Sequence, residues 1–420
     1  MFETNNLNNI DISVESAFDT YLNAISEENL EYENINVEDS LSRILYDDIT
    51  VKRDYPSFDK ALEDGYAVNS SDVLSARQNN PIKLEIIGET NVENLERLTI
   101  LTKQAVKISK GAFLPENADA IILPADAKEK DGLLNVFKSV TPDSWIAKKG
   151  EDIKADEVFI KKNRKIRPQD IGGIIGIGFR QVKVYKKPVV TIIPTGNELV
   201  PLDVDPDSNQ IIASNGYVLK GFVEQFGGIG RISSIVKDDL NQVKSAISKA
   251  LEVSDMILVS GGSSAGSKDY TFQAIKSLKN SVIIAHGIAM RPGNHVLLAL
   301  VDNKPVIGLP GHPVSNLTSF HIFGKAVLRK LAGSARSFWQ ERKDNIKLDA
   351  LLAKKICSPL GKEDYVRVRL FEQEDGKITA YPYTGKSSFL STLVKSHGIV
   401  KIPSECGCLY EGDRVEVLLF

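Results

Sequence analysis

The chain has 420 residues, of which 42% are hydrophobic and 25% are charged, and its formal net charge is −3. A chain of this length exceeds one ordinary hydrophobic core and predicts several domains of about 100–200 residues each. The near-neutral charge, without a polybasic run, argues against nucleic acid and against an anionic membrane surface as partners. No apolar stretch approaches the ~20 residues of a membrane span, so the composition predicts a soluble multidomain protein.

The N-terminus and the cysteines indicate the compartment. Residues 1–6 lack the positive and apolar regions of a signal peptide. Three cysteines are too few for a disulfide framework, and we expect Cys357, Cys406 and Cys408 to be reduced thiols of a cytoplasmic protein. The Cys406–Cys408 pair has no second pair and no nearby histidine, which disfavours a zinc site.

The first half of the chain changes from helical to strand patterns and back. Apolar residues recur at helical spacing over 14–22, behind Ser13, a residue type that caps helices. A second short helix is predicted over 37–45. From about 50 to 141, short apolar stretches broken by polar turns predict an all-β insertion. A predicted helix at 168–175 then indicates a return to the first layer.

From about residue 187 strands alternate with helices. The apolar run Met256–Ser260 is typical of a strand buried on both faces of a parallel sheet. Similar strands are predicted over 189–193, 232–236 and 306–309, each followed by a loop and a helix. These units predict a doubly wound α/β sheet. The last part of the chain alternates again and, with a hairpin turn at Asp375-Gly376, predicts a small β-barrel or sandwich.

Ligands of open α/β sheets lie beyond the carboxyl ends of the strands. Four polar segments follow predicted strands: Thr195–Glu198, Asp238-Asp239, Ser260–Asp269 and Pro310–Ser315. The small residues of Ser260–Gly266 would let backbone N–H groups approach a phosphate, although a purely structural turn is the alternative. Glu198, Asp238 and Asp269 together predict a hard-cation site, whereas an acid of this kind alone is more often a helix cap than a ligand.

Two common nucleotide-binding classes do not fit. Gly176 and Gly178 lack the third glycine of a dinucleotide fingerprint, because Gln181 stands in its place. Residues 385–387 resemble the end of a phosphate loop, but Ala380 occupies the position of its first glycine. We therefore expect neither a dinucleotide dehydrogenase nor a P-loop NTPase.

Several segments form an ordered set of motifs along nearly the whole chain: Phe58-Asp59, Asp64–Val68, Gly111–Ala120, Gly150–Asp152, Thr195–Leu199, Ser260–Tyr270 and Gly308–Ser315. In type and order they resemble the motifs of the molybdopterin molybdenumtransferase family, the molybdenum insertases that include the E domain of gephyrin. The resemblance implies an enzyme, a transferase of molybdenum cofactor biosynthesis.

The resemblance also implies a domain organisation. A scaffold domain would comprise 1–49 and 142–182, interrupted by a β-rich domain over 50–141. An α/β molybdopterin-binding domain would span 183–336 and a C-terminal β-barrel 337–420. The implied assembly is a cytoplasmic homodimer whose cleft joins the α/β domain of one subunit to the β-rich region of the other. Molybdopterin adenylyltransferase and downstream molybdenum-cofactor proteins would be candidate partners.

The implied reaction takes adenylylated molybdopterin and molybdate as substrates, hydrolyses the phosphoanhydride with a divalent cation such as Mg²⁺, and releases AMP. The catalytic acids would be Asp59, Glu198, Asp238 and Asp269, of which the last three would also hold the metal. Lys148 is a further cationic candidate. The expected substrate-binding residues are Thr195, Gly196, Ser260, Gly261, Gly262, Ser263, Ser264, Gly266, Arg291, Pro310, Pro313, Ser315, Lys149 and Ser387.

Three segments depart from the family pattern. Lys60–Glu63 replaces Asn-Ser-x-Met, Arg291–His295 replaces Lys-Pro-Gly-Lys-Pro and loses a cation at Asn294, and His312 replaces an asparagine. Because the four acids are retained, we favour an active insertase. The alternatives are an insertase that prefers tungstate and a non-catalytic molybdopterin-binding paralogue or carrier.

Overall fold

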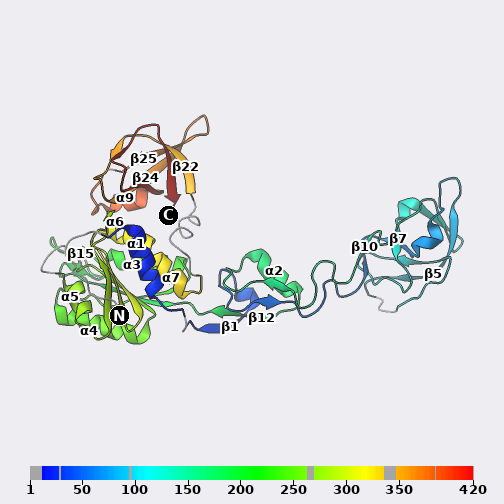
Figure 1. The fold of residues 1–420 in the computed structure, drawn as a ribbon, viewed down its shortest axis with the longest axis horizontal. Helices are drawn as coiled ribbons and strands as arrows, with labels where there is room; N and C mark the ends of the chain where they lie inside the picture. The colour runs from blue at the N-terminus through cyan, green and yellow to red at the C-terminus, as the bar shows by residue number, and fades with distance from the viewer. Residues whose placement is uncertain are drawn as a thin grey trace. The chain divides into compact units, whose positions relative to one another are not determined.

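The chain folds into two compact units in the computed structural model (Figure 1). The first unit comprises 1–35, 40–46 and 183–420, and the second comprises 36–39 and 47–182. The structure describes residues 12–27, 30–93, 97–262, 269–334, 347–383 and 385–419. Among these, no helix is both long and apolar enough to cross a membrane.

The centre of the first unit is a six-stranded sheet. Its strands follow the order β16 (Ile229–Ile232), β13 (Val189–Pro194), β17 (Met256–Ser260), β21 (Lys304–Leu309), β20 (Leu297–Val301) and β18 (Ser281–His286). The first four are parallel, whereas β20 and β18 are each antiparallel to the preceding neighbour. The predicted α/β sheet is confirmed, but the sequence reading missed these two antiparallel strands.

Helices cover both faces of this sheet. Neighbouring residues of a strand point to opposite faces, so Ile192 packs into one apolar cluster and Ile193 into the other. The helices that follow along the chain are α3 (Ser214–Gln225), α4 (Leu240–Val253), α5 (Tyr270–Lys276), α6 (Pro313–Ser319) and α7 (Lys325–Leu331). Residues of α3 and α7 belong to the first cluster and residues of α4 and α5 to the second. The sheet is therefore doubly wound.

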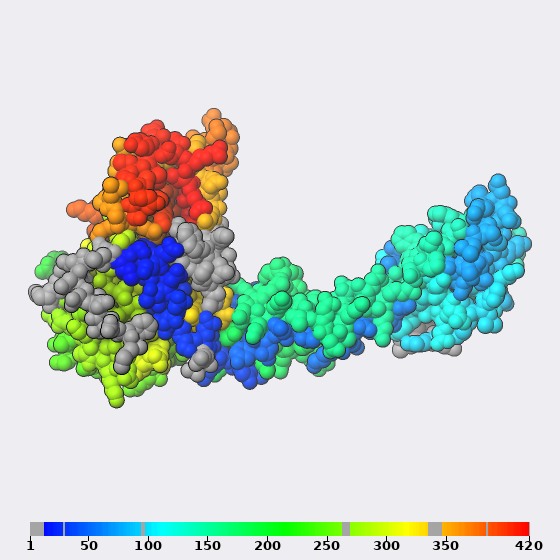
Figure 2. Space-filling view, in the orientation of Figure 1, coloured from blue at the N-terminus to red at the C-terminus, as the bar shows by residue number. Residues whose placement is uncertain are grey.

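The N-terminal helix α1 (Val14–Ala24), which belongs to the segment 1–49 predicted for the scaffold, packs on this sheet. The Tyr21 hydroxyl donates to the carbonyl oxygens of Ala299 at 3.1 Å and Val306 at 3.3 Å. Figure 2 shows the blue helix on the surface of the first unit. Helical periodicity predicts which face of a helix is buried, but it does not reveal which element covers that face.

The second predicted helix, over 37–45, is corrected. Only Val37–Asp39 is helical, as a single 3₁₀ turn. Downstream of it the backbone instead pairs with the strand segment near residue 184, where Leu45 bridges Val184. A short apolar spacing does not distinguish a helix from a turn followed by a β-bridge.

The second unit contains a six-stranded sheet within the segment predicted to be all-β. Its order is β7 (Ala120–Ile122), β4 (Gly65–Val68), β6 (Gln104–Ile108), β5 (Ile82–Thr90), β9 (Leu133–Val136) and β8 (Ala127–Lys130). The predicted helix near Pro168 is α2 (Pro168–Gly176), where Asp170 accepts from the Arg167 backbone and guanidinium. The remaining short strands of the N-terminal half are β1 (Tyr32–Asn36), β2 (Ile49–Thr50), β3 (Lys60–Ala61), β10 (Ile146–Ala147), β11 (Val158–Ile160) and β12 (Gln181–Tyr185).

The C-terminal segment forms a closed five-stranded barrel, which confirms that prediction. The ring runs β24 (Glu363–Glu372), β25 (Ile378–Pro382), β22 (Lys347–Leu352), β28 (Arg414–Leu419) and β26 (Gly398–Ile402), and β26 pairs back with β24. The expected turn at Asp375-Gly376 joins β24 to β25. The first unit also contains the short elements β14 (Leu199–Val200), β15 (Ile211–Ile212), β19 (Met290–Arg291), β23 (Ile356–Cys357), α9 (Leu390–Lys395) and β27 (Cys408–Leu409).

Two of the three cysteines form a disulfide, so the expectation of reduced thiols is wrong for them. Cys357 and Cys408 are direct partners in the antiparallel pairing of β23 with β27, and their sulfur atoms are bonded. They lie 51 positions apart in the sequence, so strand register and not spacing brings them together. Cys406 remains a free thiol.

The disulfide predicts the outcome of a thiol titration. In denaturant without reductant, Ellman's reagent should detect one thiol per chain, that of Cys406. After full reduction it should detect all three cysteines. A Cys406→Ser variant is the control and should show none before reduction. Three reactive thiols in the unreduced native chain would contradict the disulfide.

A buried histidine predicts acid sensitivity. His321 lies in the π-helical turn η4 (Phe320–Gly324), and burial lowers its pKa to about 3, aided by the charges of Lys325 and Arg329. An unfolded histidine has a pKa of about 6.5, so below that pH the unfolded chain takes up a proton that the folded chain refuses. The stability from neutral His321 is complete above that pH and is lost on acidification towards pH 3.

The native chain should therefore lose up to about 1.4 kcal/mol of unfolding free energy per pH unit below ~6.5 through this group. His321→Gln removes the titrating group and should flatten this part of the pH dependence, as measured by urea unfolding between pH 7 and pH 5. Equal slopes for native protein and His321→Gln would contradict the prediction.

Candidate active site

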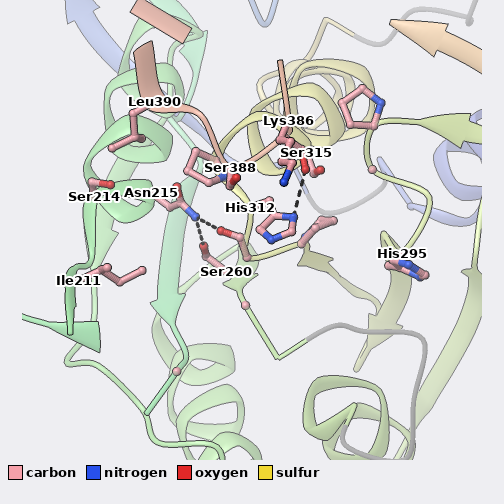
Figure 3. Close-up of a pocket in the computed structure, with 18 of the residues that line it drawn as sticks. Ile211, Ser214, Asn215, Ser260, His295, His312, Ser315, Lys386, Ser388 and Leu390 are labelled. Atoms are coloured by element: carbon pink, nitrogen blue, oxygen red, sulfur yellow. Dashed lines mark hydrogen bonds between the residues drawn. The ribbon is translucent and has the colours of Figure 1, made fainter. Parts of the chain in front are cut away.

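One cavity of about 2080 Å³ lies at the carboxyl ends of the parallel strands in the first unit (Figure 3). The structure brings all four predicted polar segments to this cavity. Their lining residues are Thr195, Gly196, Asn197, Glu198, Asp238, Ser260, Gly261, Gly262, Pro310, Gly311, His312, Pro313 and Ser315. Ser263, Ser264 and Gly266 lie outside the described residues.

Buried hydrogen bonds fix the floor of the cavity. The Ser260 hydroxyl, 3% exposed, accepts from the Asn316 side chain at 3.0 Å, and Asn215 donates to the Gly311 carbonyl at 2.8 Å. A Cβ at Gly261, which has φ of +109°, would lie 2.3 Å from the Thr195 carbonyl oxygen. Glycine is therefore required where this loop crosses the end of the neighbouring strand.

Thr195 presents an unused polar atom at this floor. Its side chain is 3% exposed, and its Oγ1 has no hydrogen-bond partner among the described residues. A buried hydroxyl without a partner costs free energy, and such atoms in native proteins call for an explanation. Because Thr195 lines the cavity, a bound ligand would satisfy this hydroxyl.

Glu198 and Asp238 place two carboxylates at the cavity. The Glu198 carboxylate folds over Gly196, where a Cβ would lie 2.8 Å from its oxygens. Asp238 and Asn197 hydrogen-bond reciprocally: the Asn197 N–H donates to Asp238 at 3.4 Å, and the Asp238 N–H donates to the Asn197 side chain at 3.2 Å. These contacts hold the two strand ends together.

Asp269 has different surroundings. It is 3% exposed, is absent from the cavity lining, and caps α5 by accepting from the Phe272 N–H at 2.8 Å. Its other carboxylate oxygen lies 3.1 Å from Nε2 of His286, whose ring stacks on Phe272 with centroids 4.6 Å apart. Both oxygens of Asp269 are therefore engaged.

These placements bear on the predicted magnesium site. Within the described ranges, no group of three or more histidine, cysteine, aspartate or glutamate side chains is arranged to hold a metal ion. Glu198 and Asp238 nevertheless suit Mg²⁺, which commonly takes one or two carboxylates and completes its octahedron with water and substrate phosphates.

The barrel supplies a cationic wall that the sequence reading largely missed. Of its basic members, only Arg291 was predicted, and it lies 3.7 Å from the buried Asp364. The basic side chains that line the cavity are Arg291, Lys355, Arg367 and Lys386. A usable signal was the pair Asp364 and Arg367, because a charged pair inside a barrel strand is rarely placed in the interior without a role.

Arg367 is the most buried of these cations, with 6% exposure. Its Nη2 donates to the Gly385 carbonyl at 3.2 Å, whereas its Nε has no partner among the described residues. Burial lowers the pKa of Arg367 and raises that of Asp364, while Arg291 opposes the latter shift. Arginine stays charged despite such a shift, so the wall presents a positive group with a free donor.

Ser387 lies beside the same wall. Its hydroxyl oxygen is 3.1 Å from Nδ1 of His312, and its carbonyl oxygen accepts from the Val314 N–H at 3.1 Å. The predicted residues Pro310, Pro313 and Ser315 line the cavity next to this contact.

The remaining predicted residues form a cluster within the second unit. Asp59 accepts from the Lys149 N–H at 2.7 Å and lies 3.5 Å from the Lys148 ammonium. Lys148 also pairs with Asp143 at 2.8 Å, and that hydrogen bond raises the pKa of Lys148. Lys149 lies 3.7 Å from Asp54. The sequence therefore predicted residues that contact one another.

Three family models match the chain in order. They are "MoeA N-terminal region (domain I and II)" over 12–178, "Probable molybdopterin binding domain" over 191–330 and "MoeA C-terminal region (domain IV)" over 349–420. The fold and the cavity thus define a multidomain protein of the molybdopterin-binding class.

Full-length relatives define the family. A protein of Methanocaldococcus jannaschii named for molybdopterin biosynthesis is 33% identical over 94% of this chain and 93% of its own. A molybdopterin molybdenumtransferase of Staphylococcus epidermidis is 28% identical over 92% and 90%. The crystal structure of a molybdopterin biosynthesis MoeA protein from Pyrococcus horikoshii has a TM-score of 0.84 at 31% identity, covering 98% and 99% of the two chains. The chain belongs to the MoeA family of molybdopterin molybdenumtransferases, and it is a transferase of molybdenum cofactor biosynthesis.

The capping contact of Asp269 predicts how its substitutions affect stability. Asp269→Ala removes the acceptor for the Phe272 N–H and should lower the unfolding free energy by about 1 kcal/mol. Asp269→Asn keeps a capping oxygen and should lie within a few tenths of a kcal/mol of native. Chemical unfolding of the three proteins tests this. Equal losses in both variants would show that the carboxylate charge, and not the cap, stabilises this helix start.

Proposed function

We propose that the protein inserts molybdate into adenylylated molybdopterin and releases AMP in a reaction that depends on a divalent cation. One observation carries the proposal: a single cavity joins carboxylates at the strand ends to a cationic wall on the barrel. Membership of the molybdopterin molybdenumtransferase family supports the choice of substrates.

The charges of the cavity suit these substrates. The phosphoanhydride and molybdate are both anionic, so bringing them together requires positive charge. Arg291, Lys355, Arg367 and Lys386 supply it from one wall. Arg367 adds an Nε donor that has no partner within the described part of the chain. It is largely buried, where a hydrogen bond to an anion is stronger than in water.

The opposite wall would hold the metal and the nucleotide. Glu198 and Asp238 would bind Mg²⁺ together with substrate phosphate oxygens. When bound, the cation neutralises charge on the phosphoanhydride and stabilises the leaving phosphate. The Thr195 hydroxyl would donate to the substrate, and the close-packed Gly261 and Gly262 would let their backbone lie against it. Asp269, with both oxygens engaged, would act by ordering the start of α5 beside this site.

The expectations from the sequence about location, assembly, the second-unit cluster and partners complete the proposal. The protein would be a cytoplasmic homodimer, and Asp59 with Lys149 would serve the molybdate end of the reaction. Molybdopterin adenylyltransferase would deliver the adenylylated substrate, and downstream molybdenum-cofactor proteins would take the product. Light scattering of the purified chain measures the oligomeric state directly.

The proposal predicts a defined loss of turnover. Purified protein with Mg²⁺ and molybdate should release AMP from adenylylated molybdopterin, and chelation of the cation should stop the reaction. Glu198→Gln and Asp238→Asn should each lower kcat about 100-fold, because each removes charge from the metal end of the cavity. Chromatographic measurement of AMP under single- and multiple-turnover conditions provides the readout.

The exposed Asp205 offers a charge-matched control near the same strand ends, and Asp205→Asn should turn over at the native rate. Native protein that binds the pterin tightly without releasing AMP would contradict the proposal.

A second candidate, a non-catalytic molybdopterin carrier, is motivated by the departures from the family pattern at Lys60–Glu63 and Arg291–His295. A carrier would bind pterin with an affinity that does not depend on molybdate and would show no hydrolysis. Multiple turnover excludes it. Parallel reactions with molybdate and tungstate distinguish the tungstate-preferring variant of the insertase, because the preferred oxyanion gives the faster AMP release.

A further inference from the structure

A short loop of the barrel forms hydrogen bonds with the α/β part of the first unit at the cavity. This loop, residues 385–388, follows β25 and precedes α9. On the barrel side, Arg367 Nη2 donates to the Gly385 carbonyl at 3.2 Å. On the other side, the Val314 N–H donates to the Ser387 carbonyl at 3.1 Å, and Nδ1 of His312 lies 3.1 Å from the Ser387 hydroxyl (Figure 3).

The side-chain contact faces the cavity. His312, Lys386 and Ser387 all line it, and Figure 3 shows His312 and Lys386 within the group of lining residues. The backbone bond from Val314 already holds the loop in place. The imidazole–hydroxyl bond is therefore not required to attach the loop, and its consequence lies in the orientation of the hydroxyl.

The direction of this bond decides what Ser387 offers a ligand. A hydroxyl has one hydrogen to donate and two lone pairs. If Nδ1 of His312 lacks a proton, the Ser387 hydrogen points at the ring and only lone pairs remain for the cavity. If Nδ1 carries the proton, the ring donates to the Ser387 oxygen, and the hydroxyl hydrogen is free to turn to a ligand. Only the second arrangement suits an anion.

We infer that His312 is a positioning residue: its Nδ1–H holds the Ser387 hydroxyl as a hydrogen-bond donor toward a tetrahedral oxyanion in the cavity. The inference rests on the proposed function for the identity of that oxyanion, molybdate. Two charged neighbours in the lining, Lys386 and Arg367, favour an anion at this wall. A bound oxyanion selects the tautomer that leaves the serine hydrogen free.

Substitutions at both ends of the bond test this role. His312→Leu removes the donor, and Ser387→Ala removes the hydroxyl, while the backbone bond from Val314 stays. Each should weaken molybdate binding by the full-length protein about tenfold, the effect of losing one hydrogen bond to a charged group. The double variant should bind no more weakly than either single variant, because both changes remove the same interaction. Titration calorimetry with molybdate alone measures all four affinities.

Two further variants separate orientation from general packing. An asparagine amide nitrogen is attached to Cγ, as Nδ1 is, so His312→Asn can place a donor at the same point and should restore near-native affinity. The amide of His312→Gln lies one carbon further out, and this variant should behave like His312→Leu. A role in packing alone would favour glutamine at least as much as asparagine.

The outcomes also separate this inference from the proposed reaction. Single losses that multiply to about 100-fold in the double variant, or native affinity in His312→Leu, would overturn the role of His312 even where AMP release is intact. Absence of molybdate binding in the native protein would overturn it as well. Coupled losses of molybdate binding in a protein that releases no AMP would support it and would instead contradict the insertase reaction.

Discussion

The cavity forms where backbone pairing joins the α/β part of the first unit to the barrel. Strand β19 pairs with the start of β24, where the Glu363 N–H donates to the Ala289 carbonyl at 2.9 Å. Strand β24 is ten residues long and pairs with both β25 and β26, so fixing its start fixes the position of the barrel. The cavity lining therefore combines residues of the α/β sheet region with residues of the barrel, which are separate segments of the sequence.

The same pairing explains the charge of the barrel wall. It places Arg291 beside Asp364, and Arg367 follows three positions later on the same strand. Burying one carboxylate among several cations offsets part of its desolvation cost and leaves the wall with a positive excess. That excess is available to an anionic ligand, and the Arg367 Nε, which has no partner among the residues that the structure describes, offers such a ligand a hydrogen-bond donor. The barrel thus contributes chemistry to the site as well as stability.

Much of this architecture could be predicted from the sequence, and the remainder has identifiable reasons for being missed. The apolar strand Met256–Ser260 and the polar segments after such strands predicted the sheet and one side of the cavity, because strand ends of a parallel sheet converge. The alternating apolar residues of the last segment and the turn at Asp375-Gly376 did the same for the barrel. Lys355 and Arg367 were missed, since their position depends on barrel register. The Cys357–Cys408 disulfide was missed for the same reason.

Residue type alone does not reveal the role of an acid that follows a strand, as Glu198, Asp238 and Asp269 show. All three follow strands, and an acid in that position serves equally as a helix cap or as a ligand. In the structure, Asp269 caps α5 and contacts His286, whereas Glu198 and Asp238 line the cavity. Glu198 and Asp238 line one wall of the cavity and the basic side chains line the other, so the cavity carries charges of both signs. In the proposed reaction, an anionic substrate that carries a metal ion would neutralise both sets of charges. The near-neutral net charge of −3 conceals this separation, because it counts both walls together.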